Sequence, residues 1–301
     1  MIKILSSKDY EEKTRNYGDC IVFIEGGTAI VYDCGSEEHA KRVIQLLDEN
    51  DIEQANVVLS HNDDDHFKGI PYLIDEGRAS NLFTILLLKY KDDLLDEIND
   101  GRRNLNSIGE AIKSLYDNIA TLSKKVKLCD VYADAEQMPS QMQLVGPSFD
   151  YMIKAAAKGL DGREGNTIDK ETVTNAASVQ IQLNSESGKI LLTGDCTPAA
   201  IPKNVDLKKF DYIQLPHHGK LLLAEEIFDR VGSKYDMVYL VSDNTGSSNG
   251  GSDDLVHKSK GHIIKNTKID GDVKFSSKSS KLTIPSVSYT HLRAHETLSD
   301  L

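Results

Sequence analysis

The chain lacks features that would have narrowed its function at once. It has no surplus of positive charge, because 35 lysines and arginines face 47 aspartates and glutamates, for a formal net charge of −12. No broad basic face is therefore available for a phosphate backbone, so attraction for nucleic acid must be local. The longest apolar runs, such as Phe83–Leu88, are too short to cross a bilayer, and no signal peptide is visible at the N-terminus. We expect no membrane partner.

Closely spaced cysteines are also absent. The four cysteines, Cys20, Cys34, Cys129 and Cys196, are scattered along the chain. This spacing predicts reduced, mostly buried cysteines in a cytoplasmic protein, rather than a disulfide framework or a structural zinc knuckle.

What is present is enough apolar sequence for a sizeable core, since 39% of the 301 residues are hydrophobic. Strand-like and helix-like segments alternate, which predicts an α/β architecture within one domain spanning residues 1–286. The expected strands include 20–25 and 28–33, joined as a hairpin at Gly26-Gly27, and 56–59, 82–88, 178–183, 189–193, 211–215, 237–241, 262–266, 272–276 and 281–284. Helices are expected at 37–49, 70–76, 222–231 and 255–260. Residues 154–174 show no apolar period, which predicts a mobile loop.

Residues 92–125 differ from their surroundings, because apolar residues recur there at helical intervals between charges. This pattern predicts one or two amphipathic helices inserted into the core fold. The insertion could serve as a packing element, or as a lid or dimer contact.

The segment 287–297 resembles the translation of a common sequencing adapter. We therefore exclude residues 287–301 as an artefactual tail and do not count His291 and His295 as ligands.

Four metal-binding side chains are concentrated directly after the strand at 56–59: His61, Asp63, Asp65 and His66. Three consecutive aspartates repel one another unless cations offset their charge. An acidic surface loop with a helix N-cap at Asp65 is the alternative.

Two later strand ends carry side chains of the same kinds. Asp195 follows the strand at 189–193, and His217 and His218 follow the strand at 211–215. In a layered α/β fold such ends can converge on one edge. Six groups then suffice for two divalent ions, each with an open position for water.

These motifs resemble the metallo-β-lactamase superfamily signature His-x-His-x-Asp-His, with Asp63 in place of the second histidine. With Gly18-Asp19-Cys20, Asp33-Cys34-Gly35, Thr193-Gly194-Asp195 and Pro216-His217-His218-Gly219, they are similar to the soluble hydrolase domain of the DNA-uptake protein ComEC and its stand-alone relatives. The resemblance spans residues 15–275 and implies a four-layer αββα sandwich with the site at one edge of the sheets.

The resemblance also implies roles for these side chains. His61 and Asp63 would hold one metal, Asp65, His66 and His218 the other, and Asp195 would bridge them. Asp65 would also orient the nucleophile, and His217 would face the substrate, although the sequence leaves open which of the two adjacent histidines is the ligand.

One departure is that no histidine lies between His66 and His217 to supply a ligand that many members have. Asn175 and Ser178 are the polar candidates for that position. Because Asp63 replaces an imidazole, preference moves from Zn²⁺ toward Mn²⁺. His257 and His262 lie outside every motif and are interpreted as ordinary helix-end and strand residues.

The resemblance predicts a metal-dependent hydrolase, of the phosphodiesterase or nuclease kind, that uses a metal-bridged hydroxide. The acidic chain favours a small phosphodiester or a single-stranded nucleic-acid end. Hydrolysis of a lactone, thioester or amide is one alternative. An inactive metal-binding regulatory module is another, although the intact ligand set argues against it.

Overall fold

The computed structural model describes residues 1–99, 101, 103–163, 165–233, 236–244, 251–258 and 261–275, with only the backbone for 256–258. Within these residues, one sheet has the strand order β15-β1-β2-β3-β4-β5-β6 and a second has the order β14-β13-β12-β11-β10-β7. Strands β8 and β9 pair separately as a small hairpin. The first sheet comprises β1 (Ile2–Ile4), β2 (Ile21–Glu25), β3 (Thr28–Tyr32), β4 (Ala55–Val58), β5 (Ala79–Thr84), β6 (Lys127–Asp130) and β15 (Val273–Phe275). The others are β7 (Met142–Gly146), β8 (Thr167–Ile168), β9 (Glu171–Thr172), β10 (Gln180–Ser185), β11 (Gly188–Leu192), β12 (Tyr212–Gln214), β13 (Val238–Val241) and β14 (Ile263–Asn266).

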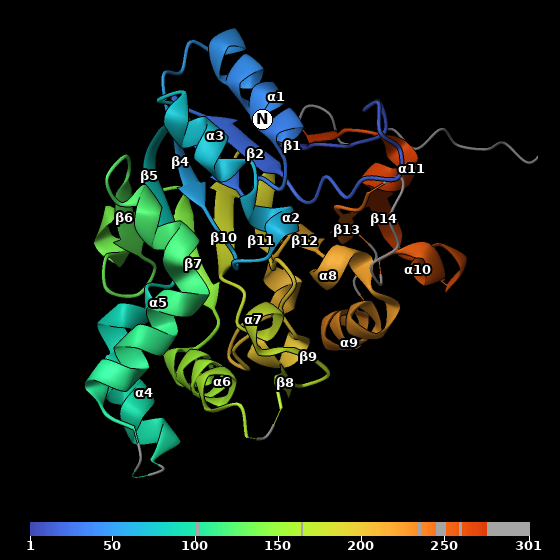
Figure 1. Cartoon of the computed structure of the whole chain (residues 1–301). Coiled ribbons are helices and arrows are strands. Elements are labelled where there is room, and N and C mark those ends of the chain that lie inside the picture. The colour runs from blue at the N-terminus through green and yellow to red at the C-terminus, as the bar shows by residue number, and fades with distance from the viewer. Residues whose placement is uncertain are drawn as a thin grey trace, which may run out of the picture.

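Helices cover the outer faces of the two stacked sheets (Figure 1). The helices of the described residues are α1 (Glu37–Glu49), α2 (Asp64–Phe67), α3 (Ile70–Asp75), α4 (Lys91–Ile98), α5 (Leu105–Leu122), α6 (Phe149–Asp161), α7 (Val173–Ala176), α8 (Pro216–Gly219), α9 (Leu221–Val231), α10 (Asp253–Lys258) and α11 (Thr267–Asp270). Short 3₁₀ turns are η1 (Leu87–Tyr90), η2 (Ala135–Gln137), η3 (Pro198–Ala200) and η4 (Leu207–Lys209).

Three apolar clusters separate the layers. Phe23 and Tyr32 of the first sheet meet Ile181 of the second in the cluster between the sheets. A second cluster packs α1 and α3 onto the outer face of the first sheet, and a third packs α9 onto the outer face of the second. The predicted α/β class and four-layer αββα arrangement are therefore confirmed.

The parallel strands determine where the site lies. Strands β3, β4, β5 and β6 run parallel in the first sheet, as do β11, β12, β13 and β14 in the second. The carboxyl ends of parallel strands share one edge, which is where ligands bind in open α/β sheets. The chain therefore delivers the residues after β3, β4, β11 and β12 to neighbouring positions.

The helices predicted within 92–125 are present as α4 and α5. With α6 they enclose their own apolar cluster, which includes Leu94, Ile108 and Met152 (lower left in Figure 1). This packing matches the interpretation of the insertion as a packing element. Leu115 of α5 is an exception, since 56% of it is exposed.

The prediction of a mobile loop at 154–174 is wrong. Helix α6, with Ser148 as its N-cap, occupies the first part of this range as far as Asp161, and β8, β9 and α7 follow. The buried face of α6 includes alanines, which are too weakly apolar to stand out as a period. The hairpin β8–β9 turns at Asp169 and Lys170, both at positive φ.

Smaller differences occur at other elements. The strand expected at 82–88 ends at Thr84 and gives way to η1, while β6 and β7 lie in segments with no predicted strand. The strand expected at 281–284 and the tail at 287–301 lie outside the described residues. All four cysteines are buried and free, as predicted. No helix in the described part of the chain is both long and apolar enough to span a lipid bilayer.

Candidate metal centre

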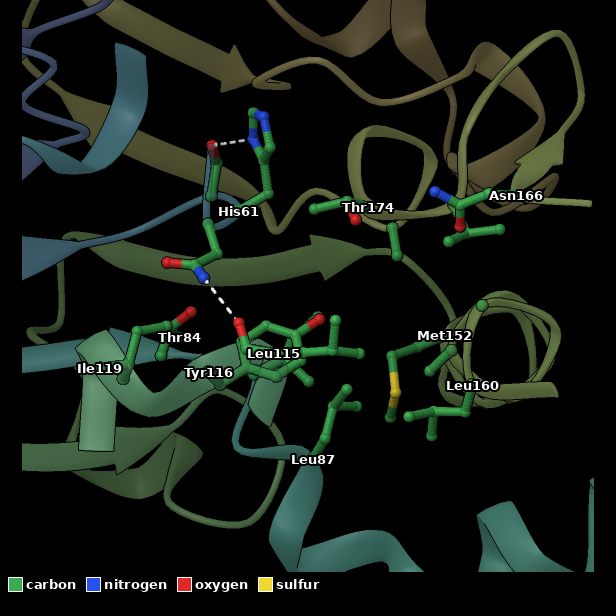
Figure 2. A pocket seen from close by; sticks show the side chains of 17 residues that line it. His61, Thr84, Leu87, Leu115, Tyr116, Ile119, Met152, Leu160, Asn166 and Thr174 are labelled. Atoms are coloured by element: carbon green, nitrogen blue, oxygen red, sulfur yellow. Dashed lines mark hydrogen bonds between the residues drawn. The ribbon is translucent and has the colours of Figure 1, made fainter. Parts of the chain in front are cut away.

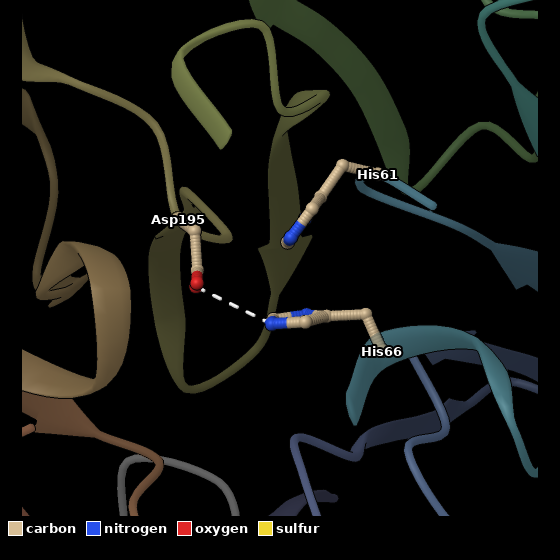
Figure 3. Close-up of side chains that lie close together, drawn as sticks. All are labelled: His61, His66 and Asp195. Atoms are coloured by element: carbon tan, nitrogen blue, oxygen red, sulfur yellow. Dashed lines mark ion pairs between the residues drawn. The ribbon is translucent and has the colours of Figure 1, made fainter. Parts of the chain in front are cut away.

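Three side chains from both sheets point toward one another at the shared edge (Figure 3). His61 follows β4, His66 lies in α2 and Asp195 follows β11. One donor atom from each lies within 4.8 Å of the other two. His66 Nε2 is 3.4 Å from Asp195 Oδ1.

The donor atoms in this cluster make no hydrogen bonds within the described part of the chain. His61 Nε2, His66 Nε2 and Asp195 Oδ1 are buried and have no hydrogen-bond partner among the described residues. A buried polar atom without a partner costs about 1–3 kcal/mol, so three together call for a ligand. Two imidazole nitrogens and a carboxylate oxygen suit a divalent transition-metal ion.

The other nitrogen of His66 is held by a buried carboxylate. His66 Nδ1 lies 2.8 Å from Asp33 Oδ2, and the Ser60 amide and hydroxyl also donate to Asp33, each at 2.7 Å. The carboxylate accepts, so Nδ1 carries the proton and Nε2 keeps its lone pair for a metal.

His61 is oriented by two hydroxyls instead. Its Nδ1 is 2.9 Å from Ser60 Oγ and 3.2 Å from Ser178 Oγ. Both hydroxyl protons are already donated, to Asp33 and to the Asn175 carbonyl, so both oxygens accept from His61. Nε2 is again the nitrogen with a free lone pair. Ser178, a candidate for the missing ligand position, therefore positions His61.

A second group of donors adjoins the first. Asp65, His66 and His218 also bring ligand atoms within 4.8 Å of one another. His218 Nε2 is 3.3 Å from Asp65 Oδ2 and 3.8 Å from Asp195 Oδ2. Its Nδ1 donates to Asp19 Oδ1 at 3.0 Å and to the Ser242 carbonyl at 3.1 Å.

His217 is held differently and is more open, at 16% side-chain exposure against 5% for His218. Its Nδ1 lies 2.9 Å from Glu171 Oε2, and Lys220 donates to the other oxygen of Glu171. Its Nε2 is 3.9 Å from Asp195 Oδ2. Sequence reasoning missed Glu171, because the residue lies in the segment predicted to be a loop.

The buried charges shift one another's pKa values. Burial opposes protonation of His66, but Asp195 and Asp33 raise its pKa well above the usual range. Burial likewise opposes protonation of His218, and Asp19 and Asp195 raise its pKa. Burial disfavours the ionised form of Asp65, yet the hydrogen bond with His218 and the nearby imidazoles hold its pKa far below normal. A divalent cation would replace these two imidazole protons as the counter-charge.

Gly18 and Gly35 explain why the segments Gly18-Asp19-Cys20 and Asp33-Cys34-Gly35 each contain a glycine. A Cβ at Gly18 would lie 1.8 Å from the Asp65 carbonyl oxygen, and a Cβ at Gly35 would lie 2.1 Å from it. Asp19 N donates to the same carbonyl at 2.9 Å, and Gly35 N donates to Asp19 O at 2.9 Å. Only glycine permits this approach, which places Asp19 beside His218.

The backbone at the site adopts uncommon conformations. Asp33, His217 and His218 have φ values of 58°, 50° and 54°. Non-glycine residues in this region cost on the order of 1–3 kcal/mol each and occur at functional sites. These backbone conformations direct the side chains of His217 and His218 toward the edge shared by the two sheets.

The remaining predicted residues lie at different depths. Asp63 Oδ2 is 3.5 Å from His61 Nε2, and its side chain is 48% exposed. Asn175 is buried and its Nδ2 lies 3.4 Å from Asp195 Oδ2. The His262 ring stacks on Phe228, with centroids 3.9 Å apart. The His257 side chain is outside the described residues.

A cavity of about 220 Å³, lined by aliphatic and uncharged polar side chains, opens beside His61 (Figure 2). Its walls come from the ends of β4 and β5 and from η1, α5, α6 and α7. In Figure 2, Leu87, Met152 and Leu160 lie across the cavity from His61. The cluster of candidate metal ligands and the cavity therefore share one histidine.

The chain is similar to one protein family model over part of its length and to several solved structures. Residues 14–82, which include the first metal motif, match a family model described as the metallo-β-lactamase superfamily. No curated protein sequence matches the chain. The metallo-β-lactamase fold protein YhfI from Bacillus subtilis is similar over 88% of this chain and 96% of that one, at 14% identity and a TM-score of 0.49. A diphosphatase from the PhnP family is similar over 92% and 99%, at 13% identity and a TM-score of 0.48. The short form of human tRNase Z is similar over 79% and 92%, at 14% identity and a TM-score of 0.40.

The stacked sheets between helices, together with the family match, identify the metallo-β-lactamase fold. Residues 14–82 carry the superfamily match, and the groups of candidate metal ligands lie where strands from both sheets end.

Proposed function

We propose that this chain is a metal-dependent hydrolase that binds two divalent ions and cleaves phosphodiesters. The observation that carries the proposal is the set of three buried donor atoms without partners, His61 Nε2, His66 Nε2 and Asp195 Oδ1. A purely structural cluster would satisfy these atoms internally.

Each ion has its own ligands in this proposal. His61 and Asp63 hold one ion, and Asp65, His66 and His218 hold the other. Asp195 belongs to one cluster of ligand atoms with His61 and His66 and to another with Asp19 and His218, which supports its role as the shared ligand. Bound there, the ions would lower the pKa of coordinated water and offset negative charge in the transition state. Three of the six proposed ligands are carboxylates, which Mn²⁺ accepts readily. Mn²⁺ as well as Zn²⁺ therefore suits this ligand set.

His217 faces the substrate and donates a proton to the leaving-group oxygen. Glu171 fixes its ring through Nδ1, which leaves Nε2 for this task. Burial raises the pKa of Glu171, but hydrogen bonds from His217 and Lys220 outweigh this and keep the carboxyl ionised. The greater burial of His218 and its contacts with two carboxylates support His218, rather than His217, as the ligand.

The phosphodiester assignment is supported by the order and spacing of the motifs, which are similar to those of ComEC-like hydrolases. The net charge of −12 favours a small phosphodiester or a single-stranded end over a long duplex.

The test is hydrolysis of bis-p-nitrophenyl phosphate by protein stripped of metal and then given Mn²⁺ or Zn²⁺. We expect turnover to return with the metal and to be absent in Asp195→Ala. If both metal sites fill and no turnover appears, the phosphodiester assignment is wrong and a carboxylic ester or lactone becomes the better substrate.

The two adjacent histidines are separated by metal content. His217→Ala should lose activity and keep two metal equivalents, whereas His218→Ala should lose one equivalent. The reverse result would exchange their roles. His262→Ala serves as a control, because His262 packs against Phe228 and should change neither quantity.

A further inference from the structure

We propose that the cavity beside His61 is a substrate subsite that binds an uncharged aliphatic group attached to the scissile phosphodiester. This inference rests on the proposed function for the position of the reacting bond. It names the chemical class of group on one side of that bond.

The first argument is the charge of the lining. None of the described residues that line the cavity carries a carboxylate, an amino group or a guanidinium group. A charged group placed there would lose its hydration without gaining a partner.

The second argument is the shape of the lining. Leu87, Ile119, Met152 and Leu160 are buried or nearly so and supply aliphatic surface. Besides His61, Tyr116 is the one aromatic residue among the described lining residues. A nucleobase would favour aromatic faces for stacking, so the aliphatic surface favours a hydrocarbon chain.

The third argument concerns the polar atoms at the rim. The Asn62 amide donates to the Leu115 carbonyl at 3.2 Å and to Asn118 Oδ1 at 3.1 Å, while Asn62 Oδ1 accepts from Asn118 at 2.8 Å. The amide is thus committed to α5 and is not free to recognise the edge of a base. Its contacts also tie the metal-motif loop to the helical insertion.

The fourth argument is the exposed leucine. Helix α5 bends at Tyr116, where φ and ψ are −124° and 25°. Leu115, immediately before the bend, lines the cavity while 56% of it remains exposed. A hydrocarbon chain in the cavity would cover this side chain. The volume of about 220 Å³ is below the roughly 300–1,000 Å³ of sites for drug-sized ligands, so the cavity suits one short group.

The experiment measures binding of methyl-, butyl- and hexylphosphonate to the metal-loaded full chain by calorimetry. All three ligands share the phosphonate group, so differences in their affinity report the contribution of the alkyl group alone. A buried methylene contributes about 0.8 kcal/mol, or about fourfold in affinity, so butylphosphonate should bind at least about tenfold more tightly than methylphosphonate.

Two variants locate the effect. Ala156→Phe, in the α6 wall, should remove the dependence on chain length and leave methylphosphonate affinity unchanged. Leu115→Ala should weaken butylphosphonate severalfold, whereas the matched change Leu222→Ala, at an exposed leucine of α9, should not. If Ala156→Phe fails to fold, the two leucine variants still decide the question.

The outcomes separate the two proposals. Affinities that do not depend on chain length, or that change equally in both leucine variants, would overturn the subsite even if bis-p-nitrophenyl phosphate is hydrolysed. A clear dependence on chain length without turnover would support the subsite and overturn the phosphodiesterase. Tighter binding of a nucleoside monophosphate than of butylphosphonate, lost in Ala156→Phe, would overturn the aliphatic assignment. Failure of all three phosphonates to bind would contradict both proposals.

Discussion

His61 lies between two regions of the molecule. The cluster of candidate metal ligands forms its polar side, and the cavity forms its apolar side. On the polar side, buried carboxylates and strained backbone hold side chains whose donor atoms lack partners. On the apolar side, helices contributed by the insertion and by α6 enclose a neutral cavity. The polar side depends on a few residues at strand ends, whereas the apolar side depends on many contacts among helices. Substitutions on the two sides should therefore fail in different ways.

The largest expected effect is on the polar side. Asp195→Ala removes the carboxylate shared by both groups of ligands, so turnover should fall at least about a thousandfold and metal content should drop. Metal analysis and the bis-p-nitrophenyl phosphate assay measure this. Asp229→Ala, an exposed site on α9, is the control. Unchanged metal content in Asp195→Ala would contradict its place between the two ions.

The matching change on the apolar side is Met152→Ala. Met152 is fully buried in the cluster of α4, α5 and α6, so the free energy of unfolding should fall by about 2–3 kcal/mol. Urea unfolding measures this, and metal content of the folded protein should stay at the wild-type value. A loss of metal without a loss of stability would remove the distinction between the two sides.

A buried histidine beneath the polar side gives a pH test. His39 contacts the Gly18 carbonyl and the Tyr10 hydroxyl, and burial lowers its pKa to about 4. The unfolded chain binds this proton near pH 6.5, so the stability contribution is present above pH 6.5 and is lost as the pH falls toward 4. The full difference is roughly 3 kcal/mol.

Urea unfolding of wild type and His39→Gln between pH 4 and pH 7 isolates this contribution. The wild type should lose stability more steeply on acidification than the variant. Parallel curves would show that His39 does not carry the dependence.

The smallest expected effect concerns the orientation of a ligand. Asp33→Asn places an amide where the His66 Nδ1–H now finds an acceptor, so metal affinity should fall by about 10–100-fold. Competition with a chromogenic chelator measures this, with Asp229→Asn as the matched control. If affinity is unchanged, Asp33 supports the fold rather than the ligand.

Short-range patterns predicted the first group of candidate ligands on the polar side. His61, Asp63, Asp65 and His66 are adjacent in sequence, and their position after a strand predicts a shared edge. The structure brings Asp195 and His218 to that edge and leaves Asp63 half exposed. The roles of these residues remain predictions until metal is measured.

Residues that orient the candidate ligands were harder to predict than the ligands themselves. Asp19 and Asp33 belong to motifs that the resemblance singled out, but only the structure shows which imidazole each one holds. Glu171 was missed altogether, because it lies on a two-residue strand preceded by a helix whose buried face contains alanines. No local pattern links Glu171 to His217, 46 residues away.

By itself, the sequence determined the fold class, the helical insertion and the candidate ligands. Periodicity and motif spacing depend on residues that are close together in the sequence, so they can be recognised without the structure. The tertiary structure alone decided which nitrogen of each histidine is free, which carboxylate holds it, and that a neutral cavity adjoins His61. These depend on contacts between segments far apart in the chain, such as His218 with Asp19 and His217 with Glu171.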